Sequence, residues 1–391
     1  MKHIIIITLL VTAAIFSMYG PAGQVSAEEN GSVNATEQHD APEGAHTGQP
    51  ATSADGDITI ETEVDNSLLY PGEEVHLANM RQLTFEGENA EAYFSADGTK
   101  LILQRHVEEG GCDQIYIMDI ESGEMELVST GDGACTCSYF HYPDDDMILY
   151  ASTHLYGEEC PPRADMSLGY VWTLHDEFEV FTALPDGSNL TRLTDSWGYD
   201  AECAFAHDGT SIVWCSDAGG DLEIWTMDPD GSNKVQLTDT LGYDGGPFFS
   251  WDSSMICWRG YYPETEQEIN SYLGGLEVNG IRPMPLQIMI MNRDGSNKQQ
   301  LTDNGAANFC PFFMPNDVGV IYTTNYNAVY PMDFNLWIVD INGENHEQVS
   351  FYDGFDAFPM FSPDGKKLAF ASNRNAATPG DTNIFICDWI D

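Results

Sequence analysis

The stretch YDAECAFAHDGTSIVWCSDAGGDLEIWTMDPDGSNKVQLTD, residues 199–239, contains the unit that the rest of the chain repeats. Four short runs rich in β-branched and aromatic residues predict strands. They are Cys203–Ala206, Ser211–Cys215, Glu223–Met227 and Val235–Thr238. Asp208-Gly209 separates the first pair and Pro229-Asp230-Gly231-Ser232 the last pair, and such residues favour tight turns. A single four-stranded meander cannot bury both of its faces, so the unit must pack against copies of itself.

Six copies can be followed along the chain. Each closes on a Leu/Val-Thr/Ser pair: Leu83-Thr84, Val128-Ser129, Leu193-Thr194, Leu237-Thr238, Leu301-Thr302 and Val349-Ser350. A marker residue stands three positions before each apolar core: Asn89, Cys135, Asp200, Asp244, Asn308 and Asp356. The markers are 44–48 residues apart, except for two spacings of 65 and 64. A period of roughly 40–50 residues with four strands is typical of a propeller blade. We therefore expect an all-β, six-bladed β-propeller of four-stranded antiparallel blades, with insertions in the second and fourth blades.

The two ends of the repeat region predict how the ring closes. The last copy ends with Ile384–Trp389 and has no fourth strand before the sequence stops at Asp391. Val75–Thr84 reads as a fourth strand with no blade before it. We expect this N-terminal strand to pair with Ile384–Trp389, which leaves no open edge between blades.

The N-terminal region predicts export. Residues 1–27 contain Lys2, the apolar run Ile4–Phe16 and the small residues Val25-Ser26-Ala27, a pattern typical of a secretory signal peptide and too short to span a bilayer. Residues 28–70 are polar and acidic and predict a flexible linker, with the propeller over 71–391. We expect a monomer, with no membrane span, in the periplasm or outside the cell.

The chain is strongly acidic. It has 63 Asp and Glu residues against 14 Lys and Arg, a formal net charge of −49. Such a field repels nucleic acid and anionic lipid, which excludes both as partners. Two interpretations stay open: a surface adapted to high salt, or one that collects divalent cations or basic partners.

Nine cysteines in an exported chain permit disulfides, and their odd number leaves at least one thiol free. Four of them fall in loops or strand starts of the first two blades: Cys112, Cys135, Cys137 and Cys160. We expect one disulfide there, between Cys160 and either Cys137 or Cys135. Cys203 and Cys215 flank one hairpin and are a weaker second candidate.

One mouth of the propeller channel is the predicted binding face. The connection entering the first strand of each blade lies on the same face as the connection between strands two and three. The predicted binding residues are the markers and their neighbours on this face: Asn89, Glu91, His154, Asp200, Glu202, Asp244, Asn308 and Asp356. Both insertions, 153–176 and 261–286, crowd the same mouth, and residues 264–276 predict a short helix. Asn325–Phe334 adds Tyr326, Tyr330 and Asp333, and aromatic loops on a rigid scaffold favour binding.

The markers allow two interpretations. An Asp or Asn before a strand also caps turns by bonding to nearby backbone amides. Alternatively Asp200, Asp244 and Asp356, with Glu202, form a Ca²⁺ or Mg²⁺ site, because these ions prefer oxygen ligands.

Three segments resemble the repeat of the TolB-type six-bladed propeller family: Phe361–Arg374 (FSPDGKKLAFASNR), Ile224–Thr238 (IWTMDPDGSNKVQLT) and Ile288–Thr302 (IMIMNRDGSNKQQLT). The resemblance covers residues 71–391. In Gram-negative bacteria TolB links an inner-membrane complex to a peptidoglycan-associated lipoprotein and carries an α/β domain before its propeller. The resemblance implies an exported, TolB-related protein of the cell envelope, here without that α/β domain. Similar repeats occur beside peptidase domains and in oligogalacturonate lyases, so the repeat does not fix an activity.

The sequence shows no Gly-x-Ser-x-Gly elbow and no His-Glu-x-x-His motif. Our first hypothesis is therefore a non-enzymatic propeller that binds a protein or peptide at the insertion-bearing mouth. The second is a divalent-metal-dependent lyase or hydrolase acting on acidic glycans, with His154 or His175 as base. A third is an acidic structural protein with no specific ligand.

Overall fold

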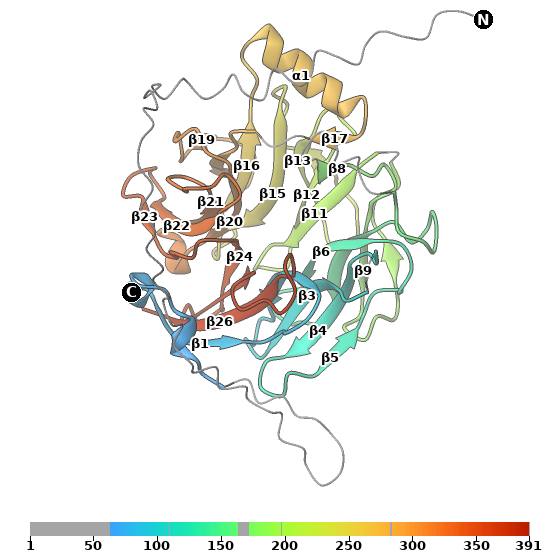
Figure 1. The fold of residues 1–391 in the computed structure, drawn as a ribbon. Coiled ribbons are helices and arrows are strands. Elements are labelled where there is room, and N and C mark those ends of the chain that lie inside the picture. The colour runs from blue at the N-terminus through green and yellow to red at the C-terminus, as the bar shows by residue number, and fades with distance from the viewer. Residues whose placement is uncertain (1–62, 109, 163–171, 197, 282–283, 391) are drawn as a thin grey trace, which may run out of the picture. The chain divides into compact units, whose positions relative to one another are not determined.

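The computed structural model of the chain describes residues 63–108, 110–162, 172–196, 198–281 and 284–390, all within one compact unit, Pro50–Asp391. Six four-stranded antiparallel sheets form a six-bladed β-propeller (Figure 1), which confirms the predicted fold class. The predicted signal peptide and almost all of the predicted linker lie outside the described residues and stay predictions. Residues 66–68, at the end of that linker, form a 3-10 helix (η1, Asn66–Leu68) that contacts the propeller.

In blades 1 to 5 the strands pair in chain order, from the first at the channel to the fourth at the rim. Blade 1 holds β2 (Glu88–Phe94), β3 (Lys100–His106), β4 (Gln114–Asp119) and β5 (Met125–Leu127). Blade 2 holds β6 (Cys135–Phe140), β7 (Ile148–Ser152), β9 (Glu179–Ala183) and β10 (Thr191–Arg192). Blade 3 holds β11 (Asp200–Phe205), β12 (Ile212–Ser216), β13 (Glu223–Met227) and β14 (Val235–Gln236). The four predicted strands of the repeat unit thus match β11–β14 to within three residues at each end.

Blade 4 holds β15 (Tyr243–Phe249), β16 (Met255–Tyr261), β18 (Gln287–Asn292) and β19 (Gln299–Gln300). Blade 5 holds β20 (Asn308–Phe313), β21 (Gly319–Thr324), β22 (Asn335–Asp340) and β23 (Glu347–Gln348), with a 3-10 helix, η4 (Pro315–Asp317), in its first turn. Blade 6 holds β24 (Asp356–Phe361), β25 (Lys367–Ser372), β26 (Asn383–Trp389) and, from the N-terminal side, β1 (Leu77–Gln82). The side chains between neighbouring sheets are almost fully buried and form the core.

The N-terminal strand closes the ring as the sequence predicts. β1 pairs antiparallel with β26, with Leu77 opposite Trp389 and Gln82 opposite Phe385 (Figure 1). A buried Arg374, 2% exposed, reinforces the closure from inside. Its guanidinium donates to Glu73 of the 3-10 helix η2 (Glu73–Val75) at 2.9 Å and to Asp356 of β24 at 2.6 Å. Arg374 therefore links the segment before β1 to the last blade.

Every blade repeats the same polar contact between its third strand and its closing pair. The Thr or Ser of the closing pair accepts a hydrogen bond of 2.8–3.0 Å from the backbone N–H of the second residue of strand three: Ile115, Val180, Ile224, Ile288, Leu336 and Ile384. The residue before each of these six is polar, and the marker of the next blade lies beside it. These first residues of strand three are Gln114, Glu179, Glu223, Gln287, Asn335 and Asn383. The closing hydroxyl thus ties the fourth strand to the third, which explains its recurrence.

Both insertions follow the second strand of their blade, on the face that the sequence predicts. The blade 4 insertion contains α1 (Glu266–Leu276), which begins at a capping box formed by Thr265 and Glu268. The predicted helix was two residues longer at its N-terminus. The insertions also pair with each other, since β8 (Trp172–Thr173) of blade 2 lies antiparallel to β17 (Gly280–Ile281) of blade 4. No helix in the described residues is long and apolar enough to cross a membrane.

Candidate functional site

The predicted binding residues Asn89 and Asn308 are fully buried in the seams. Asn89 Nδ2 donates to the carbonyl oxygens of Glu86 at 3.0 Å and Thr382 at 2.9 Å. Asn308 Nδ2 donates to the carbonyl oxygen of Leu286 at 2.7 Å. Both amides hold the chain entering strand one against the preceding blade, which is the capping role that the sequence left open. Their predicted role in binding stays a prediction.

The three predicted metal ligands each bind partners near their own seam. Asp200 accepts hydrogen bonds from Trp214 Nε1 at 2.9 Å and Ser196 Oγ at 2.6 Å. Asp244 accepts from Trp258 Nε1 and Tyr262 Oη, both at 2.6 Å. Asp356 is bound by Arg374, as described above. The described residues contain no group of three or more His, Cys, Asp or Glu side chains that could hold a metal ion. The predicted Ca²⁺ site stays a prediction.

A β-bulge in strand one brings Glu91 and Glu202 together at the centre of the ring. In all six blades the residue two positions after the marker has a positive φ of 48–58°, and the strand register shifts there. These residues are Glu91, Cys137, Glu202, Gly246, Cys310 and Phe358. All six line one cavity of about 30 Å³, together with Arg259. That volume has room for about two water molecules.

Arg259 of β16 supplies the positive charge in this cavity. Its guanidinium bonds to Glu202 and, through Nε at 3.0 Å, to Tyr243 Oη. Glu91 lies beside this pair without a cation of its own. The pKa of Glu91 is raised to about 7, mainly by burial and in part by the charge on Glu202, while contacts with Cys137 and Arg259 oppose the rise. The cavity therefore holds the ion pair between Arg259 and Glu202 and, beside it, the Glu91 carboxyl, whose pKa lies near neutral pH.

The described insertion residues cover the cavity on the insertion side. The ring of Trp172, from β8, lies 5.2 Å from the Arg259 guanidinium and 6.2 Å from Tyr243. Phe309 meets Trp172 edge-on at 6.3 Å. Buried residues of both insertions and of strand one join them in a separate apolar cluster, which includes Leu174, Phe178, Ile281 and Leu286. In the described part of the chain, Trp172 and this cluster thus cover the cavity from the insertion side, and binding at this mouth stays a prediction.

The two histidines considered as a base lie outside this cavity. His154 Nδ1 contacts Ser152 Oγ at 2.9 Å, and its ring packs against Phe181 at 4.6 Å. Burial lowers the pKa of His154 and of His175. Neither lines the described channel cavity.

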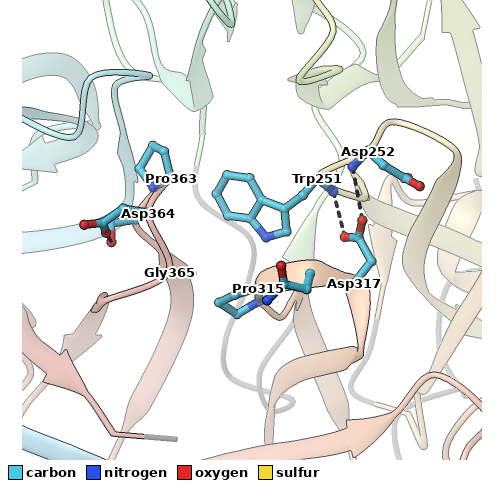
Figure 2. A pocket seen from close by; sticks show the side chains of 9 residues that line it. Trp251, Asp252, Pro315, Asp317, Pro363, Asp364 and Gly365 are labelled. Atoms are coloured by element: carbon cyan, nitrogen blue, oxygen red, sulfur yellow. Dashed lines mark hydrogen bonds between the residues drawn. The ribbon is translucent and has the colours of Figure 1, made fainter.

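An open pocket of about 380 Å³ lies on the opposite face (Figure 2). Turns between strands one and two form it, so it faces away from both insertions. Its lining residues come from blades 4, 5 and 6: Trp251, Asp252, Pro315, Asn316, Asp317, Ser362, Pro363, Asp364 and Gly365. Figure 2 shows the indole of Trp251 between Pro363 on one side and Pro315 on the other. The volume falls within the range of pockets that hold small ligands.

Trp251 is fixed in this pocket from three sides. Asp317 accepts hydrogen bonds from the backbone N–H groups of Trp251 at 2.8 Å and Asp252 at 3.1 Å (Figure 2). Trp251 Nε1 donates to the carbonyl oxygen of Phe313 at 3.1 Å. The inner face of the indole stacks on His207 at 4.3 Å. Such a rigid aromatic ring is suited to hold a ligand group with little loss of entropy.

The rim of the pocket stays negatively charged at neutral pH. Hydrogen bonds from Ser254 lower the pKa of Asp252, and those from Ser362 and Lys366 lower the pKa of Asp364. The carboxylates of both residues are exposed. The pocket thus combines an apolar floor of Trp251 and two prolines with an acidic edge.

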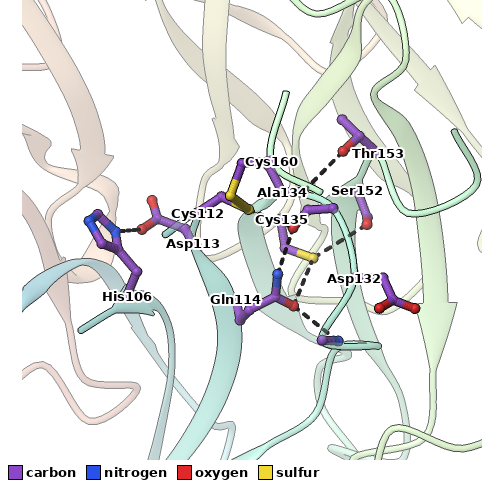
Figure 3. Close-up of a disulfide and its surroundings, with 12 residues drawn as sticks. His106, Cys112, Asp113, Gln114, Asp132, Ala134, Cys135, Ser152, Thr153 and Cys160 are labelled. Carbon is purple, nitrogen blue, oxygen red and sulfur yellow. Dashed lines mark hydrogen bonds and ion pairs between the residues drawn. A yellow bond between two sulfur atoms is a disulfide. The ribbon is translucent and has the colours of Figure 1, made fainter. Parts of the chain in front are cut away.

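The disulfide prediction needs a correction. Cys160 is bonded to Cys112, with a Cα–Cα distance of 5.5 Å, and not to Cys135 or Cys137 (Figure 3). Cys135 Sγ faces Ser152 Oγ at 3.3 Å, while Cys137 points into the channel. Cys112 lies in the connection after strand two of blade 1, on the insertion side and therefore within reach of Cys160. Cys203 and Cys215, the weaker candidate pair, are both free and buried.

Comparison with solved structures supports the fold. No protein-family model matches the sequence, and no curated protein matches it. The chain is similar to TolB from Acinetobacter baumannii, with a TM-score of 0.51 and 17% identity over 68% of this chain and 55% of that protein. It is also similar to a putative TolB from Agrobacterium tumefaciens, with a TM-score of 0.51 and 18% identity over 78% of this chain and 91% of that one. The fold is that of a TolB-like propeller.

The same likeness extends to proteins of other function. XC5397 from Xanthomonas campestris, described as a gluconolactonase, gives a TM-score of 0.52 at 11% identity over 88% of this chain and 98% of that one. At these identities the TolB-like propeller is shared as a fold, and the matches carry no activity over to this chain. The chain spans about half the length of the Acinetobacter TolB.

Sequence reasoning missed two features of this TolB-like propeller. Arg259 is a single cation within the otherwise uncharged run Met255–Tyr261, and that was a signal for a buried ion pair. The Trp251 pocket gave a weaker signal, because its residues come from three turns about 50–60 positions apart. Only the ring geometry brings those turns together.

Proposed function

We propose that this TolB-like propeller is an exported, non-enzymatic protein of the cell envelope that binds a cationic segment of a protein or peptide in the Trp251 pocket. The observation that carries the proposal is the pocket's construction, a fixed indole between two prolines with carboxylates at the rim. The disulfide between Cys112 and Cys160 supports a location outside the cytoplasm, where such bonds persist.

An arginine or lysine side chain matches this construction in both of its parts. Its aliphatic stem packs on prolines and an aromatic face, while its charged end stays near water and carboxylates. Asp252 and Asp364 stand at that edge. The net charge of −49 also attracts a basic partner over a longer range and speeds its association.

The pocket's chemistry favours binding over catalysis. Its one side-chain hydroxyl belongs to Ser362, and that group donates to Asp364 at 2.7 Å and accepts from the Lys367 N–H at 3.0 Å. The nine lining residues include no histidine, cysteine or lysine, and the carboxylates of Asp252, Asp317 and Asp364 each accept a hydrogen bond from a neighbouring backbone N–H.

Calorimetric titration with matched peptides tests the proposal. Short peptides with a central Arg or Lys are expected to bind, and the same peptides with Gln at that position to bind at least about 10-fold more weakly. Trp251→Phe keeps a ring on His207 and should weaken binding about 3–30-fold. Asp364→Asn should weaken it about 2–5-fold, and less at high salt.

Two controls separate this pocket from other sites. Asp230→Asn removes the same charge from an exposed turn between strands three and four, on the same face but outside the pocket. Tyr330→Ser changes the insertion side, where Tyr330 is 66% exposed. Neither should alter binding. Peptide binding that survives Trp251→Phe but is lost in Tyr330→Ser would move the site to the insertion-bearing mouth.

A further inference from the structure

The seam between blades 3 and 4 differs chemically from the other five. At its centre the first residue of β13, Glu223, faces the marker Asp244, and the two are 3% and 0% exposed. At the other five seams an amide or an arginine is present: Asn383 with Asn89, Gln114 with Cys135, Gln287 with Asn308, Arg192 on Glu179, and Arg374 on Asp356. In the described part of the chain, neither Glu223 nor Asp244 forms an ion pair with Lys, Arg or His.

Each of these two carboxyl groups has one buried oxygen without a donor. Asp244 Oδ1 is satisfied by Trp258 and Tyr262, but Asp244 Oδ2 and Glu223 Oε2 have no hydrogen-bond partner. Two ionised carboxylates facing each other here would leave both oxygens unsatisfied and add like-charge repulsion at low dielectric. One proton between them removes both problems, because a protonated carboxyl donates and an ionised one accepts.

We propose that Glu223 and Asp244 bind one proton between them, and that this shared proton closes the seam between blades 3 and 4. Glu223 carries the proton and donates it to Asp244 Oδ2. The site is independent of the Trp251 pocket, which lies on the other face of the ring.

The electrostatics agree with this placement. The pKa of Glu223 is raised to about 8, mainly by burial and in part by the charges of Asp244 and Asp221, while a hydrogen bond from Thr238 opposes the rise. Burial raises the pKa of Asp244 to about 6, against hydrogen bonds from Tyr262 and Trp258. The two carboxyl groups therefore titrate as a pair.

Among the described residues, the acidic, thiol and tyrosine groups packed around the pair add no positive charge. Asp221, in the loop before β13, adds a negative charge, and Cys215 of β12 donates its S–H to the carbonyl oxygen of Asp244 at 3.0 Å. Tyr262, at the start of the blade 4 insertion, donates its hydroxyl to Asp244 at 2.6 Å. Tyr272 of α1 donates to Asp221. Tyr262 thus joins the pair to the start of the blade 4 insertion, and Tyr272 joins α1 to the neighbouring Asp221.

The direction of the pH effect follows from these contacts. A free glutamate has a pKa of about 4.3. Between about pH 4 and pH 8 the folded pair therefore holds a proton that the unfolded chain has already lost. The stabilisation is complete below about pH 4 and is lost as the pH rises through about 8. Relative to a variant without the pair, the unfolding constant should rise by up to about tenfold per pH unit in this window.

Urea unfolding of the whole chain between pH 5 and pH 9 tests the proposal. Glu223→Gln supplies a permanent N–H donor to Asp244 and should flatten the pH dependence relative to wild type. Glu126→Gln, which removes an exposed carboxyl on β5, should leave it unchanged. In infrared difference spectra at pH 6, the protonated-carboxyl C=O band should be weaker in Glu223→Gln than in wild type, while the contribution of the protonated Glu91 remains in both.

Three results would overturn the shared proton. One is a pH dependence of unfolding that runs parallel in wild type and Glu223→Gln. Another is a protonated-carboxyl band at pH 6 that persists unchanged in both Glu223→Gln and Asp244→Asn. The third is stabilisation of wild type by millimolar CaCl₂ that disappears in Glu223→Gln, because a cation would then occupy the pair. If Glu223→Gln fails to fold, Asp244→Asn and the wild-type infrared titration decide the same question.

Discussion

Gly246 determines the position of the only arginine found in the central cavity. It is the bulge residue of blade 4, with a φ of +58°, and a Cβ added there would lie 2.4 Å from Arg259 Nη1. Gly246→Ala should displace the guanidinium from Glu202 and leave a buried charge without its partner. We expect a loss of about 3–5 kcal/mol in the free energy of unfolding, measured by urea denaturation.

Gly305→Ala is the matched control for this effect. Gly305 has a similar φ of +70°, but nothing lies within 4 Å of an added Cβ. Its substitution should therefore cost only the backbone strain, about 1 kcal/mol. Equal losses at both positions would mean that Arg259 adapts and that its pairing with Glu202 contributes little.

Glu91 in the same cavity makes stability depend on pH. Its pKa of about 7 lies above the value of about 4.3 for a free glutamate, so its stabilising protonated form is lost as the pH rises through 7. Glu91→Gln removes this titration. The variant should match wild type near pH 4 and exceed it by about 2–3 kcal/mol at pH 8 in urea unfolding. If wild type and Glu91→Gln differ equally at both pH values, Glu91 does not titrate in the folded state.

The residue scale also shows where sequence reasoning ends. The markers Asp200, Asp244 and Asp356 were found at the right positions, because the repeat fixes them relative to strand one. Their partners were not predictable, because Trp214, Trp258 and Arg374 meet them only after strand two has folded back. Glu91 and Glu202 were predicted from spacing alone. The bulge that directs them into one cavity could not be predicted, because residues of different types occupy the bulge position in the six blades.

At the scale of elements, the disulfide between Cys112 and Cys160 fastens the blade 2 insertion to blade 1. The two cysteines are 48 residues apart, so reduction frees a loop whose closure entropy amounts to about 4 kcal/mol. We expect reductant to lower the urea midpoint of wild type and to leave the double variant Cys112→Ser, Cys160→Ser unchanged. A midpoint that reductant shifts equally in both would show that the buried thiols, and not this bond, respond.

Element boundaries were predictable where local chemistry sets them. The β13 bounds, Glu223–Met227, match the prediction, and the capping residues Thr265 and Glu268 place the start of α1. The pairing of β8 with β17 was not predictable, because two-residue strands in different insertions meet only on the assembled ring. The same reason explains the wrong partner for Cys160, since Cys112 and Cys160 belong to different blades and meet only on the assembled ring.

At the scale of the whole molecule, the sixfold repeat made the fold predictable. Each blade depends on its neighbours for burial, so the count of closing pairs determines the count of blades, and the missing strand at the C-terminal end specifies β1 as its replacement. The location of the open pocket follows from differences between repeats. The Asp317 carboxylate ties blade 4 to blade 5 on this face, whereas blade 6 contributes Pro363 and Gly365 at the other side of the space.

The net charge of the whole chain predicts how its thermal stability depends on salt. A net charge of −49 with 14 basic residues leaves most surface carboxylates without a nearby cation, and their mutual repulsion opposes the compact state. Because the screening length falls from about 30 Å at 0.01 M to about 10 Å at 0.1 M and 3 Å at 1 M, most of this repulsion is removed below 1 M NaCl. We expect Tm to rise by roughly 5–10 °C over that range and then to level off. KCl should act as NaCl does, and sucrose should not reproduce the early rise. If instead a few millimolar CaCl₂ gives the whole increase, the surface binds divalent cations specifically, and adaptation to high salt is the wrong interpretation of its acidity.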